Sequence, residues 1–316
     1  MSAKIFIDGA AGTTGLEIRE RLSKRADLSL VQLDESGRKD IGARTRALNE
    51  ADLVILCLPD DAAREAVRLI ENPDVRVIDA STAHRVARDW IYGFPELEPD
   101  SRARIRAAKR VSNPGCYSTG FLALVRPLVR AGLIPRDYPL TVNAVSGYSG
   151  GGKAMIDEFE NKASPAFTEA VVRSYALTLS HKHIPEMQLH AGLEHPPVFS
   201  PAVGRYYRGM LVDVPLQLWS LPGKPTVAAI HQAIAAAYEN AELVDVARLT
   251  DGITLKTLDA EALKDTNHMK LYVFGNDMYG QARLCAVLDN LGKGASGAAV
   301  QNMNLMLGLS ETAGLV

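Results

Sequence analysis

The sequence predicts an α/β protein that combines a Rossmann-like, doubly wound parallel sheet with a second domain of the α+β type. Its 316 residues are about twice the length of a typical single domain. The first part of the chain alternates short apolar strands with helical segments, which is the pattern of a parallel sheet covered by helices. Beyond residue 140 the expected strands are longer and more widely spaced, which indicates a change of architecture.

The first domain begins with a strand, a glycine-rich turn and a helix. A helical segment at 296–309 carries an apolar face with Ser296 available as its cap, and we expect it to pack back on this domain. The first domain is therefore predicted to comprise residues 1–115 with 296–316. Its other elements follow from the spacing of apolar residues, with strands at 4–8, 28–33, 53–58 and 75–78 and helices at 16–22 and 61–70.

The second domain is predicted to comprise residues 116–295. It opens with a helix, which Pro127 should end or kink because proline lacks a backbone donor. The segment 194–204 is expected to be rich in loops. Longer strands are expected at 141–145, 209–218 and 272–274.

The composition is that of an ordinary globular protein, with 47% hydrophobic, 6% aromatic and 23% charged residues. A net charge of −2 gives no electrostatic basis for binding nucleic acid. No segment reaches membrane-spanning length, and the amino-terminal residues do not resemble an export signal. Three cysteines are too few for a disulfide framework in a chain of this length. We therefore expect a cytoplasmic protein.

The turn after the first strand has the features of a dinucleotide-binding loop. Gly9, Gly12 and Gly15 are spaced three apart, and Thr13 and Thr14 begin the helix that follows. Bare backbone amides and a helix amino terminus at this place can face a pyrophosphate. The spacing departs from the common G-x-G-x-x-G pattern, so the alternative is a simple tight turn.

The end of the second strand bears on the choice between the two nicotinamide dinucleotides. An acidic residue there binds the ribose 2′-hydroxyl, whereas basic residues accept a 2′-phosphate. Asp34 and Glu35 are acidic, but Ser36, Arg38 and Lys39 follow at once and could bracket a phosphate. We favour NADP(H); the alternative is that these basic residues form a solvated charged turn.

Cys116 has the sequence context of a reactive thiol. It follows the Pro-Gly turn of the run Ser112-Asn113-Pro114-Gly115 and stands at the start of a predicted helix. The helix amino terminus and its amide donors stabilise a thiolate at that position. Cys57 and Cys285 lie within apolar runs and are interpreted as small buried hydrophobic residues.

A thiolate that accepts an acyl group needs a nearby proton carrier, and the run from His181 to Glu186 has the highest density of histidine in the chain. If that run is extended, the rings of His181 and His183 share a face. The two could instead be metal ligands, but no further residues follow at convincing zinc spacing. We expect no metal.

Two further segments suit anionic ligands. The glycine-rich run 147–153 offers backbone amides, the hydroxyl of Ser149 and the ammonium of Lys153, although a flexible hinge is the alternative. Arg85 stands just beyond the fourth strand, at the sheet edge where ligands gather. Its alternative is a surface ion pair.

Taken together, these motifs resemble those of the N-acetyl-gamma-glutamyl-phosphate reductases of arginine biosynthesis, specifically the shorter second type. The run beginning Asp289-Asn290-Leu291-Gly292 is also similar to one shared more loosely by aspartate-semialdehyde dehydrogenases. The resemblance extends over nearly the whole chain and rests on the segments 9–15, 79–85, 112–116, 147–153, 181–186 and 289–302.

The resemblance implies NADPH-dependent reduction of N-acetyl-gamma-glutamyl phosphate to N-acetylglutamate semialdehyde through a cysteine thioester. It implies Cys116 as the nucleophile and His183 as the general acid/base. It also implies a catalytic and dimerisation domain of the semialdehyde dehydrogenase kind, in a homodimer or homotetramer. The implied substrate contacts are His181, Arg85, Asn113, Ser149, Lys153 and Arg208. The implied cofactor contacts are Gly9, Gly12, Thr13, Thr14, Gly15, Ser36, Arg38, Lys39, Pro59, Ser81 and Asn290.

Three other interpretations fit parts of the sequence. An aspartate-semialdehyde dehydrogenase-like enzyme would also use a thiol, a histidine and NADP(H). An NADP(H)-sensing regulatory protein would keep the dinucleotide loop, but the presence of both Cys116 and His183 would then be unexplained. A thiol hydrolase would use the same two side chains without the cofactor.

Overall fold

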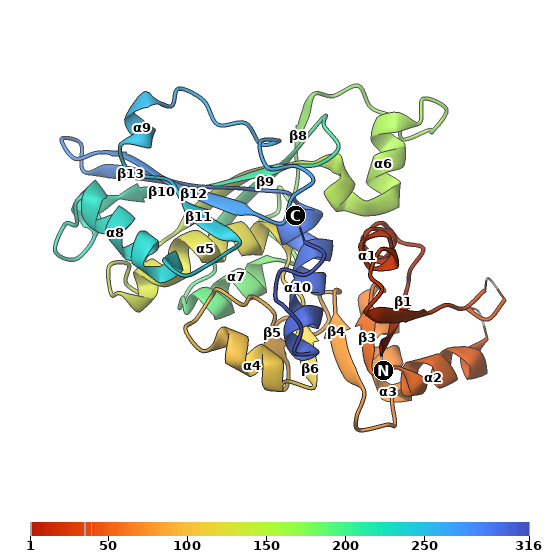
Figure 1. Ribbon diagram of the computed structural model, residues 1–316. Coiled ribbons are helices and arrows are strands. Elements are labelled where there is room, and N and C mark those ends of the chain that lie inside the picture. The colour runs from red at the N-terminus through yellow and green to blue at the C-terminus, as the bar shows by residue number, and fades with distance from the viewer. Residues whose placement is uncertain (1, 35, 39, 316) are drawn as a thin grey trace. The chain divides into compact units, whose positions relative to one another are not determined.

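The structure, a computed structural model, describes residues 2–34, 36–38 and 40–315. The chain divides into two compact units (Figure 1). The first unit is Met1–Pro114 together with Ala295–Val316, and the second is Gly115–Gly294. The carboxyl-terminal segment therefore returns to the unit that the amino-terminal segment builds.

The first unit is a parallel sheet with helices on both faces. Its strands are β1 (Ala3–Asp8), β2 (Leu28–Val31), β3 (Leu53–Leu56), β4 (Arg76–Asp79), β5 (Ile91–Tyr92) and β6 (Arg110–Ser112), in the spatial order β2-β1-β3-β4-β6-β5. Every described pairing between them is parallel. The helices are α1 (Thr13–Ser23), α2 (Ile41–Glu50), α3 (Asp60–Leu69), α4 (Ser101–Ala107) and α10 (Gly297–Met306).

Alternation along β1 explains the two layers of helices. Ile5 and Ile7 belong to a buried cluster that includes residues of α1, α4 and α10. Phe6, between them, belongs to the cluster that includes residues of α2 and α3. Because successive strand side chains point to opposite faces, one strand supplies both cores, and the unit is doubly wound as predicted.

The second unit is a mixed sheet. Its strands are β7 (Thr141–Gly147), β8 (Val172–Ser174), β9 (Val198–Gly204), β10 (Met210–Gln217), β11 (Val244–Val246), β12 (Met269–Asn276) and β13 (Gln281–Leu288), in the order β11-β12-β13-β10-β7-β9-β8. Its helices are α5 (Cys116–Arg130), α6 (Gly152–Glu160), α7 (Ile184–Ala191), α8 (Val227–Tyr238) and α9 (Asp251–Thr254). Short 3-10 turns are η1 (Tyr148–Gly151) and η2 (Leu218–Ser220), and η3 (Gly292–Ser296) is a π-helical turn. Within this unit α5 and α8 cover one face of the sheet and α7 lies along α5 (Figure 1).

The expectation that 194–204 is rich in loops was wrong, because β9 (Val198–Gly204) occupies most of the segment. Phe199, Pro201 and Val203 are buried, whereas Val198 and Ser200 are exposed. This alternation matches a strand with one buried face, and β9 pairs in parallel with β7 along its whole length. Burial of the alternate side chains therefore outweighs the tendency of the prolines in this segment to form loops.

The cap expected at Ser296 was also wrong. Its backbone is helical, with φ −66° and ψ −40°, and its side chain makes no capping hydrogen bond. A capping residue has non-helical dihedrals, and here the preceding turn η3 already leads into α10. The helix itself belongs to the first unit, as expected.

Pro127 does not end its helix, contrary to one of the two expectations for it. α5 continues to Arg130. Proline removes the donor for the carbonyl four residues earlier, which is that of Ala123. The buried hydroxyl of Tyr238, on α8, donates to this carbonyl at 2.9 Å. A tertiary hydrogen bond thus replaces the missing helical one.

We predict that Tyr238→Phe lowers the free energy of unfolding by about 1–3 kcal/mol, because a buried carbonyl loses its partner. Urea unfolding followed by circular dichroism measures the change. The matched control is Tyr279→Phe, since Tyr279 is 66% exposed. Equal midpoints for the two variants would contradict the proposed role of Tyr238.

Candidate active site

The glycine loop of the first unit has the tight geometry of a phosphate cradle. Gly9 has φ +87°, and a Cβ there would lie 2.3 Å from the carbonyl oxygen of Cys57. A Cβ at Gly15 would lie 2.5 Å from the oxygen of Gly9. Gly12 is the residue that precedes α1, and Thr13 and Thr14 form its first turn. This close approach of backbone to backbone needs glycine, and it brings a helix amino terminus to the sheet edge.

The position of the loop also suits a dinucleotide. It follows β1, and β1 lies between β2 and β3, so the strand order reverses here. In open parallel sheets, ligands bind at the carboxyl ends of the strands where the order reverses. The residues present therefore fit the cofactor that the sequence implies.

The turn after β2 carries the residues expected near the ribose. Arg38 lines a cavity of about 170 Å³ together with Gly9 and residues of β1 and β2. The hydroxyl of Ser36 donates to Asp34 Oδ1 at 2.9 Å. Lys39 lies outside the described residues.

The remaining predicted residues of the first unit also follow strand ends. Pro59 precedes α3 directly. The hydroxyl of Ser81 donates to Asp79 Oδ2 at 2.7 Å. Arg85 is buried, and its Nε donates to the carbonyl oxygen of Asn113 at 3.0 Å. Arg85 therefore lies in the interior rather than on the surface, and it joins the segments after β4 and β6.

In the second unit, Cys116 is the first residue of α5 and is half-buried. A Cβ placed on Gly294 would lie 2.7 Å from the Cβ of Cys116, so the turn at 289–294 packs directly against it. Desolvation, with a smaller contribution from nearby carboxylates, raises the pKa of Cys57 and of Cys285 to about 12. Those two thiols stay protonated at neutral pH.

The histidine run is a turn rather than an extended segment. His183 is the residue before α7, with φ −86° and ψ −15°. The rings of His181 and His183 lie nearly perpendicular, with centroids 4.7 Å apart. The backbone N–H of His183 donates to His181 Nδ1 at 3.1 Å. The two imidazoles lie together as expected, but a turn and not an extended strand brings them there.

Glu186 joins this turn to the start of α5. Its Oε2 accepts from the N–H of Gly115, the residue before Cys116, at 3.1 Å. Its Oε1 lies 3.9 Å from His183 Nε2. The hydroxyl of Ser118 donates to the carbonyl oxygen of His183 at 3.5 Å. A carboxylate that is 1% exposed therefore links the segment bearing the thiol to the imidazole.

Two tyrosines complete the surroundings of the histidines. The hydroxyl of Tyr175 donates to that of Tyr117 at 3.2 Å, and Tyr117 donates to the carbonyl of Ala202 at 3.2 Å. Both rings make edge contacts with His181. Burial raises the pKa of Tyr175 to about 12, and the charge of Cys116 contributes to the increase. Burial also raises the pKa of Tyr117, so both hydroxyls are neutral at physiological pH.

Sequence reasoning missed Glu186 and both tyrosines as site residues. Glu186 carried a usable signal, because it stands three residues after His183 at the start of a helix. Tyr117 follows the thiol directly, but its position alone did not indicate a contact. Tyr175 lies in a segment without a motif, and only the fold brings it to His181.

The glycine-rich run 147–153 forms η1 and the start of α6. Ser149 is buried, and its hydroxyl accepts from Asn290 Nδ2 at 3.0 Å. Asn290 Oδ1 in turn accepts from the N–H of Gly209 at 2.8 Å. Lys153 is exposed in the first turn of α6. The amide of Asn290 therefore fastens η1 to the beginning of β10.

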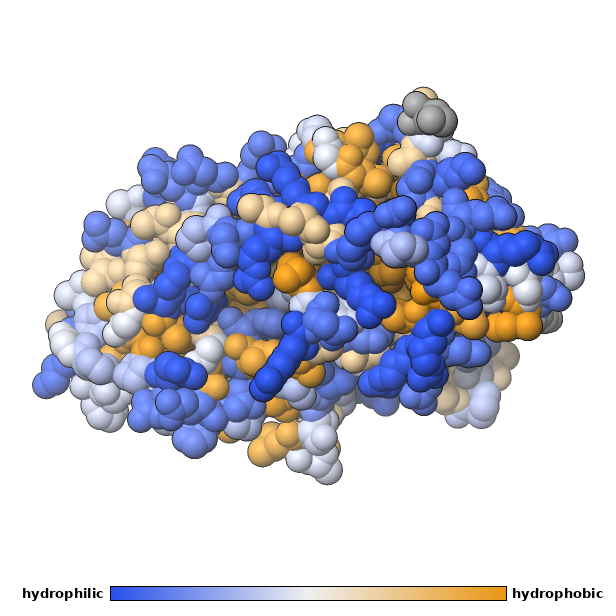
Figure 2. Space-filling model, turned by 90° about the horizontal axis from the view of Figure 1, so that it is seen from below, coloured by the Kyte–Doolittle hydropathy of each residue, from blue (hydrophilic) through white to orange (hydrophobic). Residues whose placement is uncertain are grey.

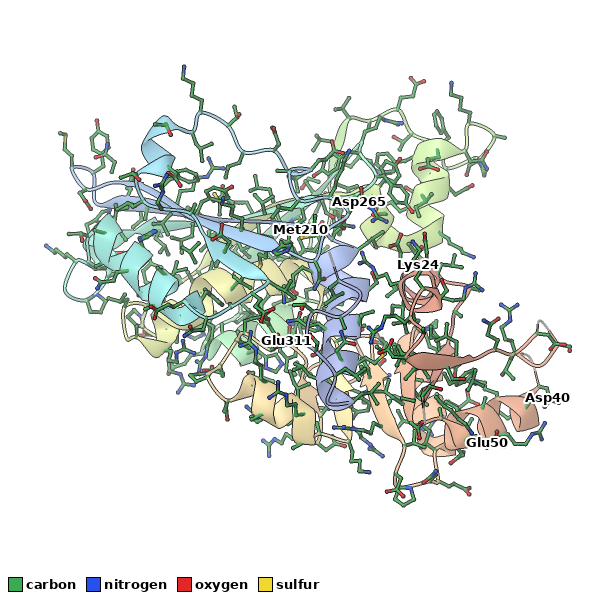
Figure 3. All side chains as sticks on the ribbon, in the orientation of Figure 1. Lys24, Asp40, Glu50, Met210, Asp265 and Glu311 are labelled. Atoms are coloured by element: carbon green, nitrogen blue, oxygen red, sulfur yellow. The ribbon has the colours of Figure 1, made fainter. Side chains whose placement is uncertain are left out.

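Arg208 forms ion pairs near the same start of β10 in the second unit. Its Nη1 lies 2.7 Å from Asp265 Oδ1 and 3.7 Å from Asp289 Oδ2. Asp265 and Met210, both labelled in Figure 3, mark this part of the second unit. The guanidinium is thus already paired with two carboxylates.

Among the residues described, no group of three or more His, Cys, Asp or Glu side chains could hold a metal ion. Within that same part of the chain, no helix is both long and apolar enough to cross a membrane. The face drawn in Figure 2 is covered mostly by hydrophilic residues with smaller hydrophobic areas between them.

Two family models match the chain. The NAD binding domain of semialdehyde dehydrogenases matches residues 4–105, and the dimerisation domain of the same proteins matches residues 116–290. The chain is 54% identical to N-acetyl-gamma-glutamyl-phosphate reductase 2 of Nostoc sp., over 99% of each sequence. It is also 54% identical to the N-acetyl-gamma-glutamyl-phosphate reductase of Brucella suis, over 98% of this chain and 100% of that one.

Solved structures share the fold at low identity. The aspartate semialdehyde dehydrogenase II of Vibrio cholerae, complexed with ASA, has a TM-score of 0.73 and 16% identity, covering 97% of this chain and 98% of that one. The aspartate semialdehyde dehydrogenase of Candida albicans, solved with NADP, has a TM-score of 0.62 and 13% identity, with coverages of 97% and 98%. These likenesses support the architecture of both units.

Proposed function

Because this chain belongs to the N-acetyl-gamma-glutamyl-phosphate reductases, within the semialdehyde dehydrogenase family, we propose that it reduces N-acetyl-gamma-glutamyl phosphate to N-acetylglutamate semialdehyde with NADPH. The observation that carries the proposal is Cys116 at a helix amino terminus, with Glu186 hydrogen-bonded to the N–H of the preceding Gly115 and its Oε1 3.9 Å from His183 Nε2. A nucleophile and a proton carrier on segments that share a buried carboxylate suit acyl transfer.

The first step is acyl transfer to the protein. The thiolate of Cys116 attacks the carbonyl carbon of the acyl phosphate, and a C–S bond forms. Backbone N–H groups in the first turn of α5 stabilise the negative charge that develops on the carbonyl oxygen. The C–O bond to phosphate breaks, and inorganic phosphate leaves with the bonding electrons. The product is a thioester on Cys116.

The second step reduces that thioester. NADPH, when bound, supplies the hydride. His183 protonates the resulting alkoxide and takes the proton back as the C–S bond breaks. Cys116 leaves as the thiolate, which returns the protein to its starting state and releases the aldehyde. The rings of Tyr175 and Tyr117, joined by the hydrogen bond between their hydroxyls, pack edge-on against the His181 ring and hold it in place.

The other substrate contacts are proposals that rest on the sequence. In the second unit we propose that Ser149 and Lys153 hold the phosphate and that His181 lines the substrate site. Arg208 stays the candidate for the substrate carboxylate, in addition to its pairing with Asp265 and Asp289. Arg85, as a further phosphate contact, and Asn113 are also proposed to bind the substrate.

Turnover with the reverse substrates tests the function. The purified protein is given N-acetylglutamate semialdehyde, NADP+ and phosphate, and the absorbance of reduced nicotinamide is followed. We expect NADPH to form, and aspartate semialdehyde to be a poor replacement. Faster turnover of aspartate semialdehyde would support the aspartate enzyme instead. NADP+ binding without turnover of either aldehyde would support a regulatory protein.

We predict that Glu186→Gln lowers kcat by about 10- to 100-fold, because His183 and the Gly115 backbone lose the charge that orients them. The affinity for NADP+ should not change, so the variant should show a lower kcat with normal cofactor binding. Glu169→Gln, which alters an exposed residue, is the control for the charge change. A kcat equal to that of the control would remove Glu186 from this role.

The assembly is proposed to be a homodimer or homotetramer. The matched domain is described as a dimerisation domain, and the sheet face opposite α5 and α8 carries exposed residues such as Asn143, Pro215 and Arg283 around a surface cavity. Light scattering of the purified protein measures the state directly. We also propose a cytoplasmic location, which suits the three free thiols.

A further inference from the structure

A cavity in the first unit gathers basic side chains from three separate elements. It lies at the ends of β1 and β2, and it has a volume of about 170 Å³. Arg19 of α1, Arg38 of the turn after β2 and Arg44 of α2 line it, together with Asp8 at the end of β1. In Figure 3 the labels Asp40 and Glu50 mark the two ends of the helix that carries Arg44. Three arginines and one aspartate line it, so the balance of charge favours an anion.

Arg44 is held in a fixed orientation. Its Nε donates to Asp8 Oδ2 at 2.8 Å, and its side chain is 14% exposed. Glu65 lies farther away, with its Oε2 4.0 Å from Nη1. The Nη2 atom is buried and has no hydrogen-bond partner among the described residues. A buried guanidinium nitrogen without an acceptor is costly, and an oxygen of a bound anion would satisfy it.

Asp34, one of the two acidic residues expected to favour the unphosphorylated cofactor, bonds within its own loop, and the other, Glu35, lies outside the described residues. Oδ1 of Asp34 accepts from the N–H of Gly37 at 2.7 Å and from the hydroxyl of Ser36 at 2.9 Å. These hydrogen bonds lower the pKa of Asp34. Its carboxylate does not line the cavity, whereas Arg38 does. Oδ1 of Asp34 therefore bonds within the turn rather than at the cavity.

We propose that Arg44, oriented by Asp8 and assisted by Arg38, binds the 2′-phosphate of NADP(H) and sets the preference of the protein for the phosphorylated cofactor. Arg44 follows the second strand by 13 residues, beyond the run from Ser36 to Lys39 that the sequence predicts as the phosphate-binding segment. The proposal rests on the cofactor site of the proposed function. It is tested by binding alone, so it can succeed or fail whatever the aldehyde substrate proves to be.

The test is calorimetric titration of the full-length protein with NADP+ and with NAD+. In Arg44→Met we expect the affinity for NADP+ to fall at least about 10-fold, as for loss of a charge-assisted hydrogen bond, while the affinity for NAD+ changes less than about 2-fold. Arg64→Met is the matched control, because Arg64 is an exposed arginine of α3 that does not line the cavity. Equal weakening of both cofactors would overturn the proposal.

A second variant guards against misfolding. Arg44→Met leaves Asp8 without its partner, and burial already raises the pKa of that carboxyl. Arg44→Lys keeps a cation beside Asp8 but removes the additional guanidinium nitrogen, so it should fold and still lose affinity for NADP+ selectively. Titration with 2′-AMP and 5′-AMP isolates the phosphate contact. A folded Arg44→Lys protein that binds 2′-AMP and NADP+ as tightly as the parent would contradict the assignment.

Discussion

Replacing Cys116 by serine abolishes turnover and leaves cofactor binding intact. Serine keeps the shape of the side chain, but its hydroxyl is not ionised at neutral pH and is a far weaker nucleophile than a thiolate. The expected loss in kcat is on the order of 10⁴-fold or more, the scale seen when a covalent nucleophile is removed. The glycine loop belongs to the other unit, so titration with NADP+ should give the affinity of the parent protein.

The control for this variant is Cys285→Ala. Cys285 is buried in β13 and its pKa is raised to about 12, so its loss should lower stability without changing kcat of the folded protein. If Cys116→Ser kept substantial turnover, or if Cys285→Ala lost it, the thioester would have to be placed elsewhere.

Replacing His183 by asparagine lowers kcat by about 10²-fold or more, the usual contribution of a general acid/base. Asparagine keeps a polar group of similar reach before α7 but cannot transfer a proton. The thiol of Cys116 should still react with iodoacetamide, which separates proton transfer from nucleophile formation. His268→Asn, at an exposed position, is the control. An unchanged kcat in His183→Asn would exclude this residue as the proton carrier.

Local patterns predicted much of the first unit. The alternation in β1 and the glycine spacing before α1 depend only on neighbouring residues, so a reader of the sequence can find them. The order of the strands in the second sheet cannot be predicted from neighbouring residues. β9 lies between β7 and β8, and this pairing depends on contacts between distant segments. The continuation of α5 past Pro127 also depends on a distant segment, because the hydroxyl of Tyr238 on α8 bonds the carbonyl that the proline leaves without a donor.

The site divides in the same way. Cys116 and His183 stand in sequence motifs that indicate a nucleophile and a proton carrier. Glu186 lies three residues after the histidine, at helical spacing. Arg44 and Tyr175 have no local signal. Arg44 can be recognised as a candidate ligand only in the structure, where α2 lies near the end of β1 and Asp8 binds its guanidinium beside a cavity. Tyr175 contacts His181, but it lies in a segment whose conformation the sequence does not predict.

We propose that the acyl group passes through a thioester on Cys116. The most direct test mixes the protein with N-acetylglutamate semialdehyde and NADP+ in the absence of phosphate, followed by acid quenching and peptide mass spectrometry. Without phosphate the acyl group has no acceptor, so we predict one equivalent of NADPH per active site and a peptide containing Cys116 that is heavier by one N-acetylglutamyl group. Formation of NADPH with an unmodified Cys116, or with the acyl group on another residue, would contradict the account.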